Sequence, residues 1–116
     1  MFKIDNDILS WHKKTFPDVK LEGMLLKLDE ELGELVEAIK KEDEAEELKE
    51  TADLYIVARI LNDRFNSYIG AFFLGMIHNS EVKNLEQAVE KKMEINRKRK
   101  WNIKNGVYKH EEEKKE

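Results

Sequence analysis

Hydrophobic residues recur along this chain with the period of an α-helix. In the segment 19–41, leucine and isoleucine return every three or four residues, which places them on one helix face. The segment 45–66 repeats this pattern, and the wholly charged stretch 40–44 separates the two. The sequence therefore predicts two central antiparallel helices that pack as a hairpin through their apolar faces. The predicted face of the first helix consists of Leu21, Leu25, Leu28, Leu32, Leu35 and Ile39.

Three further helices are predicted outside this hairpin. Residues 5–15 form a first helix, with Asp5 or Asn6 as its N-cap. The apolar segment 67–79 forms a short buried helix or part of an oligomer interface. Ser80 is a good N-cap for a last long helix over 81–100. The chain is thus expected to fold as an all-α helical bundle.

The segment 101–110 carries the only sign of β-structure. Its dipeptide Asn105-Gly106 is the strongest short hairpin signal. With this dipeptide as the turn, Ile103 lies opposite Tyr108 and Trp101 lies opposite His110. We therefore expect a short C-terminal β-hairpin.

Length and composition limit the class of protein. The 116 residues suit one domain, and we assign residues 1–110 to a single helical domain and 111–116 to a disordered charged tail. A net charge of −4 gives no global basic field for nucleic acid. The longest apolar run, 68–77, is far shorter than the roughly 20 residues that span a bilayer. With no signal peptide and no cysteine, the expected location is the cytoplasm, with no membrane partner.

Acidic residues occupy unexpected positions on the two central helices. Glu31 and Glu34 are three residues apart, as are Glu50 and Asp53, so each pair shares one helix face. At about 100° per residue, Glu50 and Asp53 fall on the apolar face of their helix. Carboxylates are rarely buried unless they are paired or bind a metal. If the helices pack as a hairpin, the four carboxylates can converge, and they would repel one another unless a cation neutralised them.

The composition also indicates which cation would bind. The chain has no cysteine, which excludes a thiolate site, and its three histidines never complete the E-x-x-H pair of di-iron bundles. Carboxylate oxygens favour hard cations, Mg²⁺ first and Mn²⁺ second. The sequence therefore predicts an acidic metal site between the two central helices, suited to Mg²⁺ that bridges a phosphorylated substrate.

The same acids carry a resemblance to a known family. Glu30-Glu31-Leu-Gly-Glu34, followed by Glu50-Thr-Ala-Asp53, resembles the EExxE…ExxD signature of the MazG-like all-α nucleoside triphosphate pyrophosphohydrolases. The resemblance covers roughly residues 8–110. It implies cleavage of a nucleoside triphosphate between the α- and β-phosphates. It further implies that Glu31, Glu34, Glu50 and Asp53 hold Mg²⁺, and that Glu30 or Glu31 takes a proton from water.

The basic end of the last helix extends the resemblance. The stretch KMEINRKRKW (92–101) is similar to the family's basic K…N..R.W segment. The resemblance implies that Lys92 and Arg99 neutralise phosphate charge and that Asn96 hydrogen-bonds phosphate, sugar or base. Trp11 lies in a segment that resembles some members. It is either a core residue or a stacking surface for a nucleobase. The family is oligomeric, so a homodimer or homotetramer is expected.

Two other functions remain open at this stage. The chain could be a non-catalytic helical interaction or regulatory protein, or a relative that acts on a phosphorylated metabolite other than a nucleotide. The base, the sugar, the number of metal ions and the phosphorus attacked are also open. For the assembly, we expect the uncharged segment 68–77 to need a partner subunit on one side, with Phe73 on the outward face.

Overall fold

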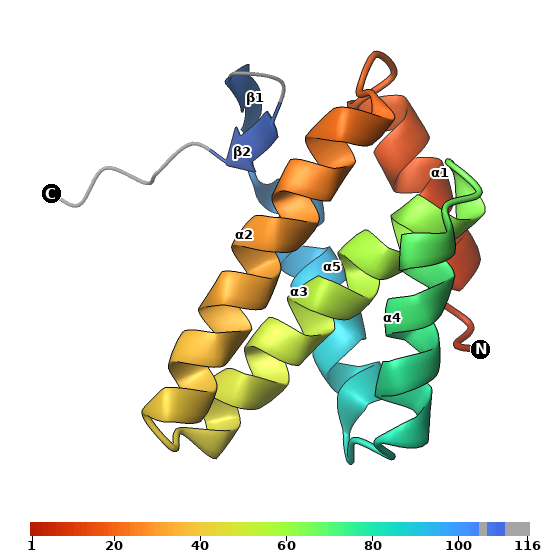
Figure 1. The fold of residues 1–116 in the computed structure, drawn as a ribbon. Helices are drawn as coiled ribbons and strands as arrows, with labels where there is room; N and C mark the ends of the chain where they lie inside the picture. The colour runs from red at the N-terminus through yellow and green to blue at the C-terminus, as the bar shows by residue number, and fades with distance from the viewer. Residues whose placement is uncertain (105–106, 111–116) are drawn as a thin grey trace, which may run out of the picture.

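The computed structural model describes residues 1–104 and 107–110. The described chain is 74% helical and contains one small antiparallel sheet, so the predicted all-α class is confirmed (Figure 1). The five described helices and two described strands are α1 (Asp5–Thr15), α2 (Leu21–Lys40), α3 (Glu44–Asp63), α4 (Tyr68–Asn79), α5 (Leu85–Lys98), β1 (Trp101–Lys104) and β2 (Val107–His110). None of these helices is long and apolar enough to cross a membrane.

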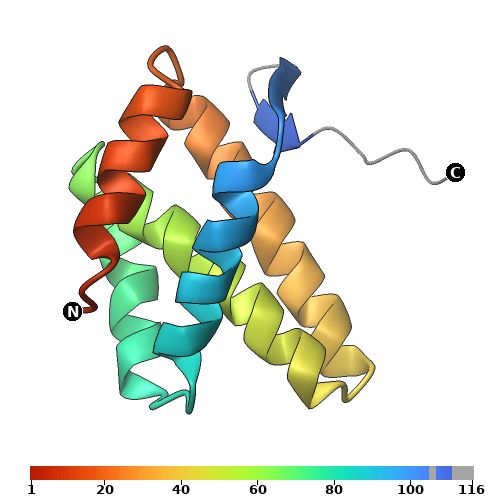
Figure 2. The ribbon, with the colours of Figure 1, turned by 180° about the vertical axis from the view of Figure 1, so that it is seen from behind.

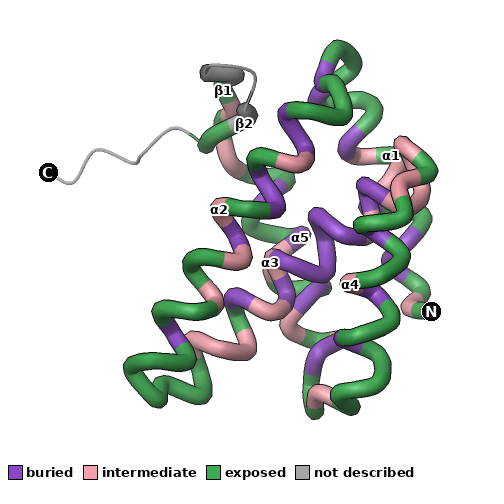
Figure 3. The backbone as a smooth tube through the Cα atoms, viewed as in Figure 1, coloured by how far each residue is buried: buried purple, intermediate pink, exposed green. Residues whose placement is uncertain are grey.

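Helix α3 forms the centre of the bundle. It contacts all four other helices, and it lies antiparallel beside α2 as the hydrophobic pattern predicts (Figure 1). Its buried residues run almost without a break from Ala52 to Leu61, because neighbours cover it on several sides (Figure 3). The turn before α3 contains no glycine, and Glu42 adopts the left-handed conformation there, with φ = 55°. Asp43 then caps α3 by accepting a hydrogen bond from the Glu46 backbone at 3.1 Å.

The first helix begins at the predicted residue but is capped differently. Its N-cap is Ile4, which makes no side-chain capping bond. Asp5 is instead buried, where its carboxylate accepts a hydrogen bond from the Tyr55 hydroxyl at 2.7 Å and pairs with Arg59 at 3.5 Å. The prediction of Asp5 or Asn6 as a cap was therefore wrong. The Asp5 side chain joins α1 to α3 across the core.

The start of the last helix also differs from the prediction. Ser80 follows α4 directly, and its hydroxyl donates a hydrogen bond back to the Met76 carbonyl at 2.8 Å. It thus closes α4 and does not open α5. Helix α5 begins at Leu85, after Asn84 takes the left-handed conformation with φ = 64°. Residues 81–84 form the connecting turn.

Helix α4 is buried on one side only. Gly70 packs against α3 so closely that a Cβ added there would lie 2.5 Å from the Asn62 backbone nitrogen. On the opposite side Tyr68 and Phe72 are 94% and 64% exposed. Phe73 is half-buried and packs against the core, so the expectation that Phe73 points outward was wrong. Phe72 and Phe73 are adjacent in one uncharged segment. No polar residue in this segment indicates from sequence which of the two lies on the outer face.

The two strands form the predicted hairpin beside α2 and the end of α5 (Figure 2). The register pairs Trp101 with His110 and Ile103 with Tyr108, as expected. The proposed turn residues 105–106 and the predicted tail 111–116 lie outside the described residues. The Trp101 indole donates a hydrogen bond to the Asn96 carbonyl at 3.0 Å, which ties the hairpin to α5. The hairpin is thereby held at the end of α5, above the acidic residues of α2.

Candidate metal centre

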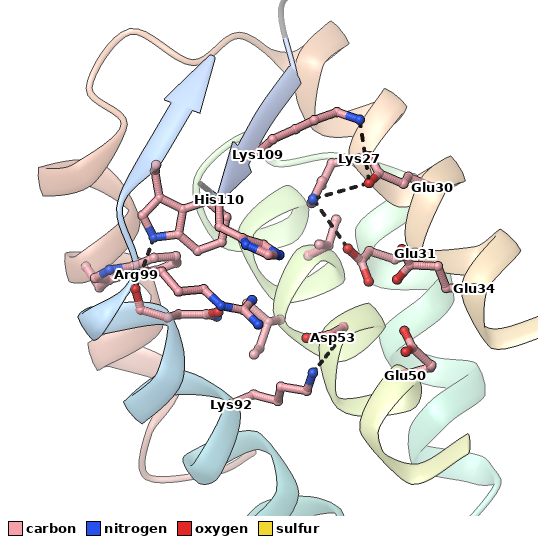
Figure 4. Close-up of a pocket in the computed structure, with 15 residues that line it drawn as sticks. Lys27, Glu30, Glu31, Glu34, Glu50, Asp53, Lys92, Arg99, Lys109 and His110 are labelled. Atoms are coloured by element: carbon pink, nitrogen blue, oxygen red, sulfur yellow. Dashed lines mark hydrogen bonds and ion pairs between the residues drawn. The ribbon is translucent and has the colours of Figure 1, made fainter. Parts of the chain in front are cut away.

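The acids of α2 and α3 converge at one point. One carboxylate oxygen from each of four residues lies within 4.8 Å of the others, and these residues are Glu31, Glu34, Glu50 and Asp53. We call this set the acid cluster. Each helix contributes one i,i+3 pair, and the antiparallel packing of α2 on α3 brings the two pairs together (Figure 4). The predicted acidic site between the two central helices is therefore present.

Two members of the acid cluster are almost completely buried. Glu31 is 7% exposed and Glu50 is 9% exposed. Within the part of the chain that the structure describes, the Oε2 atom of each has no hydrogen-bond partner. A buried carboxylate oxygen without a donor costs free energy. A proton or a metal cation at this point would remove that cost.

Burial changes the proton affinity of the acid cluster. It raises the pKa of Glu31 to about 8, and the nearby charge of Asp53 adds to the effect while Lys27 opposes it. Burial also raises the pKa of Glu50 to about 8, with further contributions from the carboxyls of Glu34 and Glu46. The pKa of Asp53 is raised by burial as well, against the opposing charge of Lys92. A divalent cation would favour the ionised forms and displace these protons.

The donor atoms suit a hard divalent cation. They are all carboxylate oxygens and come from two helices, and two of the four residues, Glu31 and Glu50, have a buried Oε2 atom without a hydrogen-bond partner in the described chain. Mg²⁺ and Mn²⁺ prefer such oxygen ligands, whereas the absence of cysteine excludes a thiolate site. The residues present therefore fit the metal that the sequence predicted.

Cationic side chains line a cavity of about 380 Å³ together with the acid cluster. Lys92 of α5 reaches Asp53, with 3.1 Å between Nζ and Oδ2. Lys27 of α2 lies 3.5 Å from Glu31. The remaining cations that line the cavity are Arg99 and Lys109, from the end of α5 and from β2 (Figure 4). We call this cavity the bipolar pocket, because acids of α2 and α3 and cations of α2, β2 and the end of α5 line it together.

The other predicted site residues also line the bipolar pocket. Glu30 lies outside the acid cluster, with its carboxylate 3.8 Å from Lys27 Nζ and 4.0 Å from Lys109 Nζ. Asn96 is buried at the α5 wall, 6% exposed. Trp11 is half-buried and stacks edge-on against Phe16, with 5.7 Å between the ring centres. Trp11 is therefore packed on the core while one part of it borders the pocket.

Sequence reasoning gave no role at the site to four residues that line the pocket, namely Lys27, Ile56, Val57 and Lys109. The strands bring Trp101, Lys109 and His110 to it, and this position depends on how the hairpin folds back over α2. Lys27 could have been found. It precedes Glu31 by four residues and Glu34 by seven, so all three side chains lie on one flank of α2. That flank is the one that faces the pocket.

Gly33 lies on α2 between the acids of the site. A Cβ added at Gly33 would meet no atom of the described chain within 4 Å. Packing within this chain therefore does not require a glycine at this position, in contrast to Gly70. The open space at Gly33 is consistent with close approach by a metal-bound ligand and equally with simple tolerance of glycine in the helix.

Comparisons of the chain with family models, with curated proteins and with solved structures give no match. A function must therefore be inferred from the residues and geometry of the bipolar pocket.

Proposed function

We propose that this protein is a Mg²⁺-dependent nucleoside triphosphate pyrophosphohydrolase of the MazG-like type. It would cleave a ribo- or deoxyribonucleoside triphosphate to the monophosphate and pyrophosphate. The observation that supports this most is the bipolar pocket, where four convergent carboxylates face Lys92 and Arg99. A divalent cation suits the acid cluster, and a polyphosphate chain suits the space between that cation and these two basic side chains.

The residues of the pocket divide into three proposed roles. The acid cluster would hold Mg²⁺, or Mn²⁺ in its place. Bound there, the ion would supply Lewis-acid catalysis and lower the pKa of water. Lys92 and Arg99 would bind phosphate oxygens, with Arg99 suited to a bidentate contact. Asn96 would position the nucleotide, and the edge of Trp11 that borders the pocket would contact its base.

The proposed reaction needs one proton acceptor. Water adds to the α- or β-phosphorus, and the bond from that phosphorus to the α–β bridging oxygen breaks. The bridging oxygen leaves with the bonding electrons on the other phosphoryl group, so the products are the monophosphate and pyrophosphate. A carboxylate takes the proton that water loses. Glu30 and Glu31 were the two candidates from sequence. Glu30 suits this task better, because Glu31 belongs to the acid cluster whereas Glu30 lies beside it.

The proposal includes assembly and location. We propose a homodimer or homotetramer in which a partner subunit covers the outer face of α4. The support is the exposure of apolar side chains on this one helix: Tyr68 is 94%, Phe72 64%, Met76 51% and Ile69 42% exposed. We propose the cytoplasm as the site of action.

A substrate panel tests the proposed activity. Nucleoside and deoxynucleoside triphosphates are incubated with Mg²⁺ or Mn²⁺, and release of pyrophosphate is measured against release of orthophosphate. We expect stoichiometric pyrophosphate from at least one nucleotide and none when the metal is chelated. Orthophosphate as the first product would contradict the proposed bond cleavage. No product from any nucleotide would favour the non-catalytic interaction protein or an enzyme for another phosphorylated metabolite.

A further inference from the structure

Two lysines contact the acid cluster from different helices. Lys27 Nζ of α2 lies 3.5 Å from Glu31 Oε1, and Lys92 Nζ of α5 lies 3.1 Å from Asp53 Oδ2. Both lysine side chains are largely buried, with 10% and 16% of their surface exposed. Their ammonium groups point at the carboxylates from different edges of the cluster (Figure 4). The cations of the bipolar pocket therefore already pair with two of the four carboxylates that suit a metal ion.

A metal ion at the acid cluster would disturb both pairs. Glu31 and Asp53 would direct their negative charge to the metal ion, and each ammonium group would then lie close to a dication. A buried charge that loses its partner is strongly unfavourable. Lys27 would keep Glu30, 3.8 Å from its Nζ atom, but both ammonium groups would be repelled by the dication, and an anion that reaches both lysines and the metal ion would offset this repulsion. A polyphosphate has several charged oxygens along one flexible chain and meets this requirement.

We propose that Lys27 and Lys92 are exchangeable counter-ions of the acid cluster. A divalent cation displaces both ammonium groups from the carboxylates, and the ammonium groups then bind the phosphates of the substrate. Lys27 is thereby a second phosphate-binding lysine, at a position outside the basic end of α5. The inference rests on the proposed metal centre and adds that metal and polyphosphate bind jointly, each strengthening the binding of the other.

The proposed exchange predicts that replacing a lysine has opposite effects on two affinities: the affinity for the metal alone rises, and the affinity for pyrophosphate in the presence of metal falls. Methionine keeps much of the length of the lysine side chain and lacks its charge. In Lys27→Met the metal no longer competes with an ammonium group for Glu31, so the metal alone should bind about tenfold more tightly. The same variant loses a phosphate contact, so pyrophosphate should bind about tenfold more weakly in the presence of metal. Lys92→Met should behave in the same way, from α5.

Calorimetric titration of the full chain measures both affinities. Mg²⁺ is titrated into the protein with and without inorganic pyrophosphate, and a titration without protein corrects for the Mg²⁺–pyrophosphate complex in solution. Lys40→Met is the matched control. Lys40 also lies on α2 and pairs with a glutamate at 3.5 Å, but its side chain is 68% exposed and lies outside the bipolar pocket. For the wild type we expect Mg²⁺ to bind about tenfold more tightly with pyrophosphate than without it.

The outcomes separate this inference from the proposed metal centre. Opposite shifts in Lys27→Met and Lys92→Met, with no shift in Lys40→Met, support the exchange. If Mg²⁺ binds the wild type but both affinities fall together in the lysine variants, the lysines serve only to hold the site and the exchange is wrong. Unchanged Mg²⁺ affinity in both variants refutes it as well. If the wild type binds no Mg²⁺ with or without pyrophosphate, the inference and the metal centre both fail. Circular dichroism of each variant verifies its fold, and Lys27→Gln replaces Lys27→Met if the latter does not fold.

Discussion

Replacement of Glu31 by glutamine should stabilise the metal-free protein at alkaline pH. Burial raises the pKa of Glu31 from 4.5 to about 8, so the folded state binds this proton more tightly than the unfolded state. Stability from this group is then fully present below about pH 4.5 and is lost as the pH rises through about 8. Glutamine does not ionise, so the free energy of unfolding of Glu31→Gln does not decrease with pH through this group.

The shift in the pKa of Glu31 determines how much stability the variant gains relative to the wild type at alkaline pH. One pKa unit corresponds to about 1.4 kcal/mol, so a rise from 4.5 to about 8 gives an upper limit of about 5 kcal/mol. Neighbouring carboxyls can take the proton when Glu31 is replaced, and the contact between Lys27 and Glu31 is weakened. We therefore expect the variant to gain ~2 kcal/mol over the wild type on going from about pH 5 to about pH 8.5.

Urea unfolding with a chelator present measures this gain. The relevant quantity is the difference between variant and wild type, because burial also lowers the pKa of His12 to about 3 and makes the wild-type curve depend on pH for a second reason. Glu22→Gln is the control, since Glu22 lies exposed on the first turn of the same helix. A difference between Glu31→Gln and wild type that stays constant over this pH range would refute the burial argument. The same pH dependence in Glu22→Gln would refute it equally.

Three other substitutions test the pocket, the packing and the assembly. Lys92→Ala should weaken nucleotide binding about tenfold or more in equilibrium titrations. Lys91 is exposed on the same helix, and Lys91→Ala should have little effect. Equal losses of affinity in the two variants would indicate a diffuse electrostatic field and not a specific phosphate contact. In thermal melts Gly70→Ala should destabilise by more than ~2 kcal/mol because its Cβ overlaps α3, and Gly33→Ala should stabilise by up to about 1 kcal/mol; a reversed order would contradict the packing. Phe72→Glu should dissociate the oligomer in sedimentation, and a monomeric wild type at about micromolar concentration would refute the assembly.

The convergence of the four acids could be predicted because its geometry is mostly local. The spacing of Glu50 and Asp53 fixes their common direction on a helix, and only the pairing of α2 with α3 had to be added. The hairpin was equally local, since Asn105-Gly106 indicates a turn and thereby a register. In these two cases the spacing within one segment was enough to predict the observed arrangement.

The errors came from residues whose roles depend on distant partners. Asp5 has the sequence pattern of a helix cap, but Tyr55, fifty positions away, accommodates its carboxylate in the core. Ser80 has the sequence pattern of an N-cap, but α4 ends at this residue, and the Ser80 hydroxyl donates its hydrogen bond to a carbonyl of α4. Local patterns do not distinguish these cases, because the same side chain can serve a nearby backbone or a distant helix.

The position of a bound metal ion decides most directly whether the acid cluster is a metal centre. Crystals of the protein soaked in Mn²⁺ would be measured near the manganese absorption edge, where Mn²⁺ scatters anomalously. We expect an anomalous peak among the carboxylates of Glu31, Glu34, Glu50 and Asp53, and no such peak in crystals of Glu50→Gln. Well-occupied Mn²⁺ elsewhere on the surface, with none among these four carboxylates, would contradict the proposed metal centre and the function built on it.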